Sequence, residues 1–492
     1  MKEFKRIAIA NLGEVAVRII KACQEMGIQS VLLHSEPDSQ TLAYRLSDHQ
    51  VCIGPAPTSD SYLNIQNNIR GALASGVQAI HPGFGFLSEN ANFATACKEA
   101  NLTFIGPDAD SIKLFGDKIE AKKIVEELKI KTVPGYKGEN QNIKTLTDEC
   151  EKIGYPVLVK ATAGGGGRGL KIILDKADAR EKIESAQREA LSSFGSNQVF
   201  LEKYLDHAKH IEVQIFGDAL GKIHILCERE CTVQRRHQKI IEEAPSAALT
   251  SIERQTLYDL ARKIAEKSRY INAGTIEFLF QDGEFYFIEM NTRLQVEHPA
   301  TEMILNLDLV KAQILTAQGI PLNWNTTELS ARGHAIECRI YAEDSYSKGM
   351  PSVGQIGDMQ LPSGPGRRFD FGFETGDAIT PYYDPMIGKL IVWDENRPQC
   401  IKKAIEVLSQ TIIFGVNTNI PFLKAILSHP DFISATMTTQ FVEKYFQNGL
   451  EPKTLKSHQQ EFAAFAYERS SSNATSSEKA TLPDPWRQDW RI

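Results

Sequence analysis

The chain has 492 residues, of which 42% are hydrophobic and 24% are charged, and its formal net charge is −7. This length suffices for three or four domains of ordinary size, and the composition is typical of a globular chain. The acidic balance argues against a nucleic-acid-binding protein, which usually presents a basic surface, and no stretch is apolar for long enough to cross a bilayer.

The start of the chain and its cysteines predict the compartment. The first residues, MKEFKRIAIAN, contain no long apolar segment and no small-residue cleavage site, so we expect no secretory signal peptide. Eight cysteines are few for a chain of 492 residues, and they fit reduced thiols. We therefore expect a cytoplasmic protein.

The first hundred residues alternate between short apolar runs and a helical pattern. Residues 5–11 predict a strand, residues 14–26 a helix and residues 30–34 a second strand. This order predicts a parallel sheet. Apolar runs at 77–86 and 102–107 end in glycine and proline and predict further strands. The turn HPGFGF within the first of these runs is either a ligand site at a strand end or simply a tight turn.

A second unit starts near residue 115 with a predicted helix at 118–128. Two predicted strands, at 156–160 and 170–174, flank a run of four glycines at 164–167. The run is either a flexible linker or a loop whose backbone N–H groups approach an anion closely. It lacks the Walker A pattern, so the second interpretation is a mobile lid over phosphates, with Lys160 as a point charge.

Two strand patterns follow the glycine run. The segment HIEVQIFG at 210–217 alternates strictly and predicts a half-buried strand. The cluster QRRHQK at 234–239 is either a solvated basic loop or an anion pocket, and the lysines elsewhere favour the pocket. Cys227 and Cys231 lie near two histidines, but no second cysteine pair follows at zinc-site spacing, so a metal site there is disfavoured.

Residues 274–290 predict a hairpin with an Asp-Gly turn. A two-residue loop places Ile288 opposite Glu277 and turns Glu277 and Glu289 to opposite faces. A three-residue bulged loop places the two glutamates directly opposite each other. Paired carboxylates near phosphates would make a Mg²⁺ site, and the alternative is two glutamates on a solvent-facing sheet.

The segment MNTRLQVEH directly follows this hairpin. If it is extended, every second residue lies on one face, which then carries Asn291, Arg293, Gln295 and Glu297. That face offers a metal-binding amide, a bidentate cation for an oxyanion, a second amide and a base. An edge strand with a solvated polar face has the same pattern, but the two preceding glutamates favour a site.

A third unit starts near residue 330 with the alternating segment HAIECRIYAE. It includes a predicted helix at 398–410 and a turn at 414–419. Beyond residue 445 the composition becomes polar, as in SSSNATSS at 470–477, and this tail is too short to fold alone.

Many motifs in the same order resemble those of biotin carboxylase over residues 1 to about 445. They are IANLGEVAVRI, HPGFGFLSEN, KATAGGGGRG, ERECTVQRRHQK, IEMNTRLQVEHPATE, ECRIYAED and PYYDPMIGKL. The resemblance implies an α/β and α+β multidomain chain of the ATP-grasp fold. Its parts are an N-terminal Rossmann-like (pre-ATP-grasp) domain at 1–114, an ATP-grasp domain at 115–330 with a lid at about 132–204, a C-terminal biotin carboxylase domain at 331–445, and a linker or tail at 446–492.

The resemblance also implies site residues. ATP binding is implied for Lys118, Lys160, Gly166, Gly167, Glu202, Lys203, Tyr204, Leu205, His210, Gln234 and His237, with the two glycines in the lid and residues 202–205 at the adenine. Mg²⁺ or Mn²⁺ is implied for Glu277, Glu289 and Asn291. Bicarbonate is implied for Lys239, Arg293, Gln295 and Val296. Glu297 would be the base and Arg339 the partner of biotin.

The implied reaction is the ATP- and bicarbonate-dependent carboxylation of biotin through carboxyphosphate. No biotinylation motif of the AMKM type occurs in the sequence, so we expect the biotin on a carrier protein or domain, with the carboxyltransferase on another chain. The ending DPWRQDW resembles acyl-CoA carboxylase α subunits, the methylcrotonyl type most of all. A homodimer is also implied, without nucleic acid or membrane.

One departure and two rival functions stand beside this prediction. Leu12 occupies the position of an arginine in the family pattern IANRGE, so an ion pair made there is not expected. A different ATP-grasp ligase would share the glycine run and the metal glutamates, but not RLQVEH together with ECRI. A catalytically weak scaffold subunit of a carboxylase complex would keep the fold, and the intact set of site residues argues against it.

Overall fold

The N-terminal unit is the predicted parallel sheet. The computed structural model of the chain describes residues 2–162, 170–324 and 329–451. Five parallel strands lie in the order β3-β2-β1-β4-β5. The strands are β1 (Arg6–Ile9), β2 (Gln29–Ser35), β3 (His49–Gly54), β4 (Ala79–His81) and β5 (Thr103–Phe104), and the helices are α1 (Gly13–Glu25), α2 (Leu42–Leu46), α3 (Ile65–Ala74) and α4 (Ala91–Glu99). The HPGFGF turn begins at the last residue of β4.

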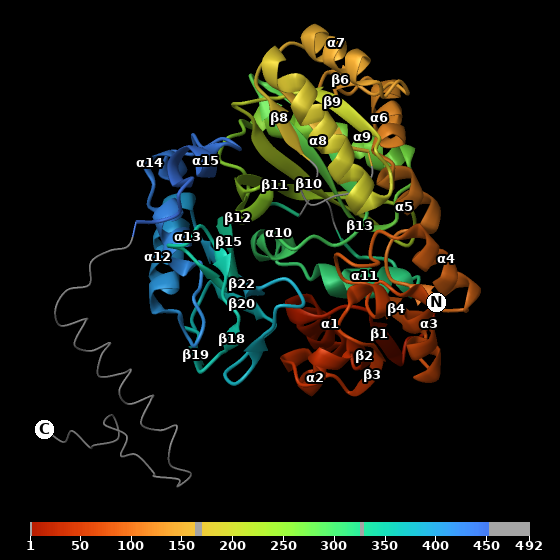
Figure 1. The fold of residues 1–492 in the computed structure, drawn as a ribbon. Coiled ribbons are helices and arrows are strands. Elements are labelled where there is room, and N and C mark those ends of the chain that lie inside the picture. Colours follow the sequence, from red (N-terminus) through yellow and green to blue (C-terminus); the bar gives the residue numbers. More distant parts are fainter. Residues whose placement is uncertain (1, 163–169, 325–328, 452–492) are drawn as a thin grey trace, which may run out of the picture. The chain divides into compact units, whose positions relative to one another are not determined.

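The second unit contains a small sheet of four strands in the order β6-β9-β7-β8. The two strands predicted on either side of the glycine run are β7 and β8, and they pair antiparallel with Val157 opposite Ile173. Gly166 and Gly167 lie outside the described residues. The elements are α5 (Ala109–Gly116), α6 (Lys118–Glu127), β6 (Gly135–Tyr136), α7 (Ile143–Ile153), β7 (Val157–Ala161), β8 (Lys171–Ile173), α8 (Lys176–Phe194) and β9 (Val199–Lys203). Helices α7 and α8 pack together beside this sheet (Figure 1).

An eight-stranded sheet connects the predicted second and third domains. Its order is β14-β13-β10-β11-β12-β15-β22-β20, so it continues across the boundary expected near residue 330. The strands are β10 (Lys209–Gly217), β11 (Ile223–Arg235), β12 (Gln238–Ala244), β13 (Asn272–Gln281), β14 (Glu284–Asn291), β15 (His334–Tyr341), β20 (Arg367–Phe371) and β22 (Met386–Asp394). The helices between these strands are α9 (Ser251–Lys267), α10 (His298–Leu305) and α11 (Leu309–Ala317).

The C-terminal part also contains helices, together with short strands that pair in two-stranded sheets of their own (Figure 1). The predicted helix at 398–410 is α12 (Arg397–Gln410). The other elements are β16 (Glu343–Asp344), β17 (Met350–Pro351), β18 (Gly354–Gln355), β19 (Asp358–Gln360), β21 (Ala378–Ile379), β23 (Ile412–Phe414), α13 (Ile420–Leu427), α14 (Pro430–Ile433) and α15 (Phe441–Phe446). The predicted tail from 452 onward lies outside the described residues.

The expectation of a half-buried strand at 210–217 is wrong. All residues of β10 after Lys209 are buried, on both faces. The apolar face, with Ile211, Val213 and Ile215, packs in one cluster with residues of α9. The opposite face carries polar side chains. Other parts of the chain cover these side chains, so they do not face solvent. Alternation reveals that a strand has two chemically different faces, but it does not reveal what covers the polar one.

The β13–β14 hairpin combines features of both sequence alternatives. Asp282 and Gly283 form a two-residue turn, both with positive φ, and Gln281 pairs with Glu284. That register continues to Phe278 and Phe287. A bulge then shifts the pairing, so that Glu277 lies opposite Glu289. The bulge in mid-strand, and not a longer loop, brings the two glutamates into register.

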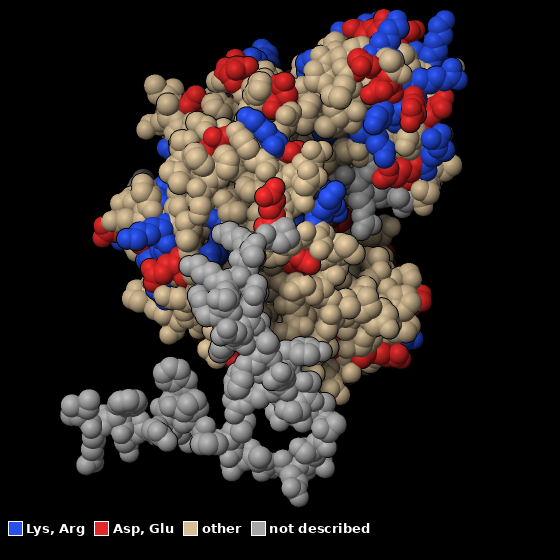
Figure 2. All heavy atoms as spheres, turned by 60° about the vertical axis from the view of Figure 1, so that its left-hand side comes forward, with Lys and Arg blue, Asp and Glu red and all other residues tan. Residues whose placement is uncertain are grey.

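The surface carries charges of both signs. On the face drawn in Figure 2, acidic and basic side chains are interspersed among uncharged ones. In the described parts of the chain, no helix is both long enough and apolar enough to span a membrane.

Helix α9 covers the apolar face of the central sheet, and its start offers a test of that packing. Thr250 caps the helix in a reciprocal capping box with Glu253. We predict that Thr250→Ala lowers the free energy of unfolding by about 1 kcal/mol, the usual effect of losing such a cap. Urea unfolding measures the change. Thr256→Ala is the control: it makes the same change at an exposed position inside the helix, where the hydroxyl bonds the carbonyl of Ile252 and caps nothing, and it should lower the free energy of unfolding far less.

Candidate active site

A single cavity of about 1070 Å³ gathers the predicted site residues. The small sheet, the central sheet and the turn after β4 all contribute to its lining. Its lining includes Lys118, Lys160, Glu202, Lys203, Tyr204, Leu205, His210, Gln234, His237, Lys239, Glu277, Glu289, Asn291, Arg293, Gln295, Val296 and Arg339. Glu297 is not in the lining and lies behind Lys239 and Arg339, with which it forms ion pairs.

The floor of the site is a row of ionisable side chains across four neighbouring strands. The register places Glu289 opposite Glu277, Glu277 opposite Glu212, and Glu212 opposite Arg229. Arg229 is fully buried and donates to Glu212 at 2.6 Å, and it also bonds the buried Gln214. Because strand pairing fixes this row, the positions of these groups depend on the backbone of the sheet.

The ammonium of Lys239 joins three carboxylates. Its Nζ lies 2.5 Å from Glu212, 2.8 Å from Glu277 and 2.8 Å from Glu297. All three carboxylates are buried. Burial raises the pKa of Glu212, helped by the nearby charge of Glu297. Burial also opposes ionisation of Glu277 and Glu297. Lys239 together with His210 outweighs burial at Glu277, and Lys239 together with Arg339 and Arg229 outweighs it at Glu297, so the pKa of both carboxyls lies below the usual range.

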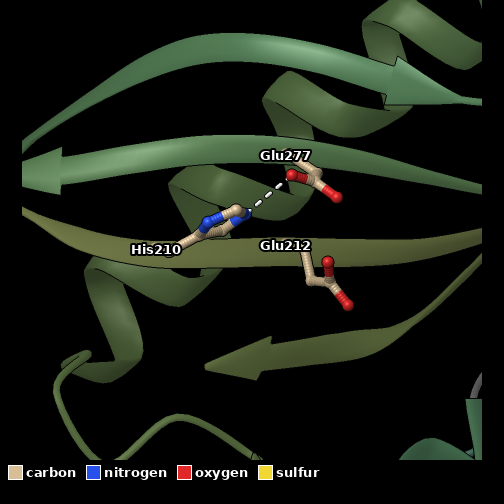
Figure 3. A group of neighbouring side chains, drawn as sticks. All are labelled: His210, Glu212 and Glu277. Carbon is tan, nitrogen blue, oxygen red and sulfur yellow. Dashed lines mark ion pairs between the residues drawn. The ribbon is translucent and has the colours of Figure 1, made fainter. Parts of the chain in front are cut away.

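Glu277 has two further partners. Figure 3 shows His210 reaching from β10 toward Glu277 on β13, with Glu212 beside them. The Nε2 atom of His210 lies 2.8 Å from Oε2 of Glu277, and the amide of Asn291 donates to Oε1 at 2.7 Å. The side-chain amide of Gln234 forms a hydrogen bond to the other ring nitrogen of His210, at 2.7 Å. Glu277 is therefore held as a carboxylate by three neighbours.

Glu297 stands at the start of α10, in the N-cap position. Its Oε1 bonds Lys239, and its Oε2 accepts from Arg339 at 2.9 Å. Arg339 also donates to Glu242 at 2.6 Å. These contacts link β12, β15 and the start of α10 through one arginine.

The other end of the cavity is rich in lysine. Lys118 pairs with Glu289 at 3.2 Å, and Lys160 pairs with Glu202 at 2.6 Å. Glu202 also pairs with the buried Lys122. Burial, together with the charge of Lys118, lowers the pKa of Lys160 to about 8. Several amines close together in a partly buried place form an anion site, and phosphates are the anions such sites commonly hold.

The segment after β14 is not the extended strand that would put four polar residues on one face. Residues 292–297 are irregular, and α10 starts at His298. The polar residues nevertheless converge, because Arg293 donates to Gln295 at 3.1 Å and to Asn291 at 3.3 Å. Arg293 is also fixed by Glu89, at 3.0 Å.

The turn after β4 belongs to the site. Its residues Phe84, Gly85 and Phe86 line the cavity together with Glu89. Of the two sequence interpretations of HPGFGF, the structure supports the ligand-site one. Leu12 also lines the cavity, beside the start of α1, and supplies an apolar wall where the family pattern has a cation.

Several residues of the site were missed by sequence reasoning. Glu212 and Arg229 are not among the predicted residues. Glu212 lies between the apolar residues Ile211 and Val213, the same signal that identified Glu277, whereas Arg229 lies between two glutamates and has no such signal. Glu89 was quoted only as part of a motif. Thr439, Gln440 and Glu443 line the cavity from the C-terminal end, and no local pattern indicates them. Among the described residues, no close group of metal-ligating atoms contains both Cys227 and Cys231.

Family models match the chain in three consecutive parts. The biotin carboxylase N-terminal domain matches residues 3–112, and the biotin carboxylase C-terminal domain matches residues 337–444. The model between them describes the ATP-binding domain of the carbamoyl-phosphate synthase L chain and matches residues 117–325. The middle model alone would fit the rival ligase, and the two flanking models distinguish the families.

Curated relatives include free biotin carboxylases and longer chains. The chain is 43% identical to biotin carboxylase 1 of Bacillus subtilis, over 90% of this chain and 98% of that one. It is also 43% identical to the propionyl-CoA carboxylase alpha chain of Mus musculus, over 92% of this chain and 63% of that one. The chain thus spans less than two thirds of the length of such alpha chains.

Solved structures agree with this relation. The biotin carboxylase of Campylobacter jejuni has a TM-score of 0.87 and 40% identity, covering 90% of this chain and 99% of that chain. The biotin carboxylase domain dimer of the Hydrogenobacter thermophilus 2-oxoglutarate carboxylase also has a TM-score of 0.87, with 41% identity and coverage of 90% and 98%. That dimer was crystallised with ADP, its magnesium salt and bicarbonate.

The low pKa of Glu297 gives a test of the buried network through stability. We predict that Glu297→Gln is less stable than the parent near pH 7, by about 3–5 kcal/mol, because Lys239 and Arg339 lose a buried anionic partner. Ionisation of Glu297 stabilises the fold above the pKa of an unfolded glutamate, about 4.3, and this contribution is lost as the pH falls toward the lower folded value. The difference between the two proteins should therefore shrink below about pH 4.

Urea unfolding at a series of pH values from about 7 to about 3 measures both effects. Glu284→Gln is the control, because Glu284 is a half-exposed glutamate paired with Lys131 at 2.9 Å. It should differ little from the parent at every pH. A Glu297→Gln difference that stays constant down to about pH 3 would contradict the ionised state assigned to Glu297.

Proposed function

Because this chain belongs to the biotin carboxylase family, we propose that it carboxylates the biotin of a carrier protein in a reaction that consumes ATP and bicarbonate. One observation carries the proposal: a single cavity joins a lysine-rich end to the cluster of Lys239, Glu297 and Arg339. A phosphate donor at the first end and a small anion at the second would then lie in the same cavity.

We assign ATP to the lysine-rich end. Lys118 and Lys160 would neutralise phosphate oxygens, and His237 reaches this end from the turn between β11 and β12. Residues Glu202 to Leu205 would contact the adenine. In the structure the carboxylate of Glu202 holds two lysines, so the adenine contacts of this stretch fall to its backbone and to its other side chains. Gly166 and Gly167, outside the described residues, are proposed to cover the phosphates.

The residues proposed for a divalent cation fit it chemically. Glu277 and Glu289 face each other across the hairpin, and Asn291 bonds Glu277. Glu277 has a lowered pKa, so it is ionised at neutral pH, as an oxygen ligand of Mg²⁺ must be. Bound there, Mg²⁺ or Mn²⁺ would offset the negative charge of the phosphates.

Bicarbonate is assigned to Lys239, Arg293, Gln295 and Val296. Arg293 is a planar cation that can bind an oxyanion bidentately, and Glu89 and Gln295 set its orientation. Glu297 is proposed to remove the proton of bicarbonate, which then attacks the γ-phosphate to give carboxyphosphate. Because Lys239 and Arg339 hold the pKa of Glu297 low, it becomes a stronger base when an anionic substrate draws those cations away.

Biotin is assigned to Arg339. Carboxyphosphate breaks down to CO₂ and phosphate, and the phosphate can take the proton of the biotin ureido nitrogen. The guanidinium of Arg339 would stabilise the resulting anion, and closure over the site would keep water from the intermediate. Arg339 lines the cavity and is held by Glu242 and Glu297 from behind, which leaves it aimed at bound substrate.

The carrier, the carboxyltransferase and the acyl or keto-acid acceptor are assigned to other chains or domains. The longer alpha-chain relatives and the free biotin carboxylases both fit this assignment. A homodimer is proposed by analogy with the dimer of the 2-oxoglutarate carboxylase domain. The names of several relatives state a mitochondrial location, and a cytoplasmic one stays our prediction for this chain.

Turnover by the purified chain tests the function. We predict ADP release with Mg²⁺, ATP and bicarbonate, increased by free biotin and lost in Glu297→Ala. A scaffold subunit would bind ATP without turnover. Turnover that needs bicarbonate but ignores biotin would favour another ATP-grasp ligase.

A second variant tests the lysine-rich end. We predict that Lys160→Ala raises the KM for ATP by roughly 10- to 100-fold, because one charge-assisted phosphate contact is lost. The melting temperature should stay close to that of the parent. Lys176→Ala, at an exposed lysine outside the cavity, is the matched control. Equal KM values in the two variants would contradict the role of Lys160.

A further inference from the structure

Glu337 on β15 is a fully buried carboxyl group that the proposed function does not use. Its exposed fraction is 0%, and neither side-chain oxygen has a hydrogen-bond partner among the described residues. It also forms no ion pair within that part of the chain. A buried carboxylate without a partner is unfavourable by several kcal/mol. Such a group therefore carries a proton, and the protonated carboxyl can donate a hydrogen bond to a second carboxyl group.

A second acid lies directly across the sheet from Glu337. The antiparallel register of β12 and β15 places Glu242 directly opposite Glu337, on the same face of the sheet. Side chains so placed have Cβ atoms about 4.5–5.5 Å apart. Oε1 of Glu242 accepts a hydrogen bond from Arg339, whereas Oε2 has no hydrogen-bond partner among the described residues. One acid therefore has an unused acceptor atom beside a second acid whose two oxygens are unused.

Arg339 decides which of the two acids is ionised. The bond from Arg339 stabilises charge on Glu242, and two adjacent carboxyls cannot both ionise cheaply. Burial raises the pKa of Glu242 to about 7, and it raises that of Glu337 well above the usual value. Glu337 is thus the member of the pair that keeps its proton.

The charged groups near Glu337 bond partners of their own. Lys389 on β22 bonds Glu14 at 3.0 Å and the carbonyl of Val296 at 2.7 Å. Glu297 and His298, at the start of α10, bond Arg339 and the carbonyl of Gln295. These groups, with Glu242 and Arg339, are the charged and titratable neighbours on this face. The charges of Lys389 and Arg339 lower the pKa of Glu337, but burial, together with the charges of Glu242 and Glu297, outweighs them.

We propose that Glu337 is a positioning residue for biotin carboxylation: it holds a proton, donates it to the free oxygen of Glu242, and thereby keeps Glu242 bound to Arg339. The proposal rests on the proposed function, because it acts through Arg339 as the partner of biotin. With this bond made, both oxygens of Glu242 are used. Without it, the carboxylate of Glu242 has a buried free oxygen and can rotate or take up a proton, and Arg339 loses its support.

This arrangement separates two parts of the reaction. Glu337 supports Arg339 and has no contact with Lys118, Lys160, Lys239 or Arg293, which we assign to ATP and bicarbonate. Arg339 also bonds the proposed base Glu297, but Glu297 keeps its bond to Lys239 when Arg339 loses this support. Loss of the proton donor should therefore weaken the use of biotin far more than bicarbonate-dependent ATP cleavage without biotin. A general loss of structure would reduce both.

The experiment compares Glu337→Met and Glu337→Gln in the full chain, with ADP release measured with and without free biotin. Glu337→Met cannot donate, and we expect the KM for biotin to rise roughly tenfold, the usual order for losing an outer partner of a site residue. Its biotin-independent rate should stay within about twofold, since no group that binds phosphate or bicarbonate is touched. Glu337→Gln keeps a hydrogen-bond donor in its amide group, so its KM for biotin should be close to that of the parent.

Ile336→Val is the matched control, because it perturbs the same strand on the opposite face and should leave both rates unchanged. A biotin KM in Glu337→Met equal to that of the parent would overturn the inference. An equal loss of ADP release with biotin and without biotin in Glu337→Gln would also overturn it. If the parent itself shows no response to biotin, the proposed function fails, and this result is distinct from a failure of Glu337 alone.

A pH profile gives a second readout that survives if Glu337→Met does not fold. In the parent, Glu337 loses its proton as the pH rises, whereas the glutamine amide keeps its hydrogens. The alkaline limb of kcat/KM for biotin should therefore lie at higher pH in Glu337→Gln than in the parent. Coincident limbs in the two proteins would overturn the proposal.

Discussion

The ammonium of Lys239 is the contact on which the site depends. It bonds Glu212, Glu277 and Glu297, which come from β10, β13 and the start of α10. Each of these carboxylates is almost completely buried, and none could stay ionised there without a cation. A buried network of this kind tolerates little rearrangement, because moving one member leaves another charge unpaired. One lysine thus fixes the relative positions of two strands and a helix start.

The sheet makes this network possible by burying both of its faces. One face is apolar and packs in a cluster with α9, as expected of an amphipathic strand. The other face is polar, and it is covered by other parts of the chain and does not face solvent. The part of the row from Glu277 to Arg229 is buried and therefore lies in a region of low dielectric, where charges interact strongly. The same burial that makes each charge unfavourable alone makes the paired set rigid.

The sequence predicts the strands and most of the site, since those depend on local pattern. Hairpin, helix and βαβ signals act over a few residues, and the motifs mark Lys239, Glu277 and Arg293 directly. The pairing of Glu277 with Glu289 was left open because a bulge near Ile288, and not the turn, decides it. The bond from Arg293 to Glu89 joins residues 204 positions apart, which no local pattern reveals. Glu212 was missed because an alternating strand looks the same whether its polar face meets water or a buried network.

Several cations of the cavity are engaged by the chain's own carboxylates. Lys118 pairs with Glu289, Lys239 with Glu277 and Glu297, and Arg293 with Glu89. Anionic substrates must therefore exchange with carboxylates instead of filling empty contacts.

Under the proposed function, each exchange prepares the next requirement of the reaction. Phosphates that draw Lys118 away leave Glu289 free as an oxygen donor, and bicarbonate that draws Lys239 away does the same for Glu277. These are two of the three residues assigned to the divalent cation, so binding of the anions and of the cation favour each other. Drawing Lys239 from Glu297 also raises the pKa of that carboxyl, which makes it a better base only when bicarbonate is present. The internal ion pairs thus make both the metal ligands and the base depend on bound substrate.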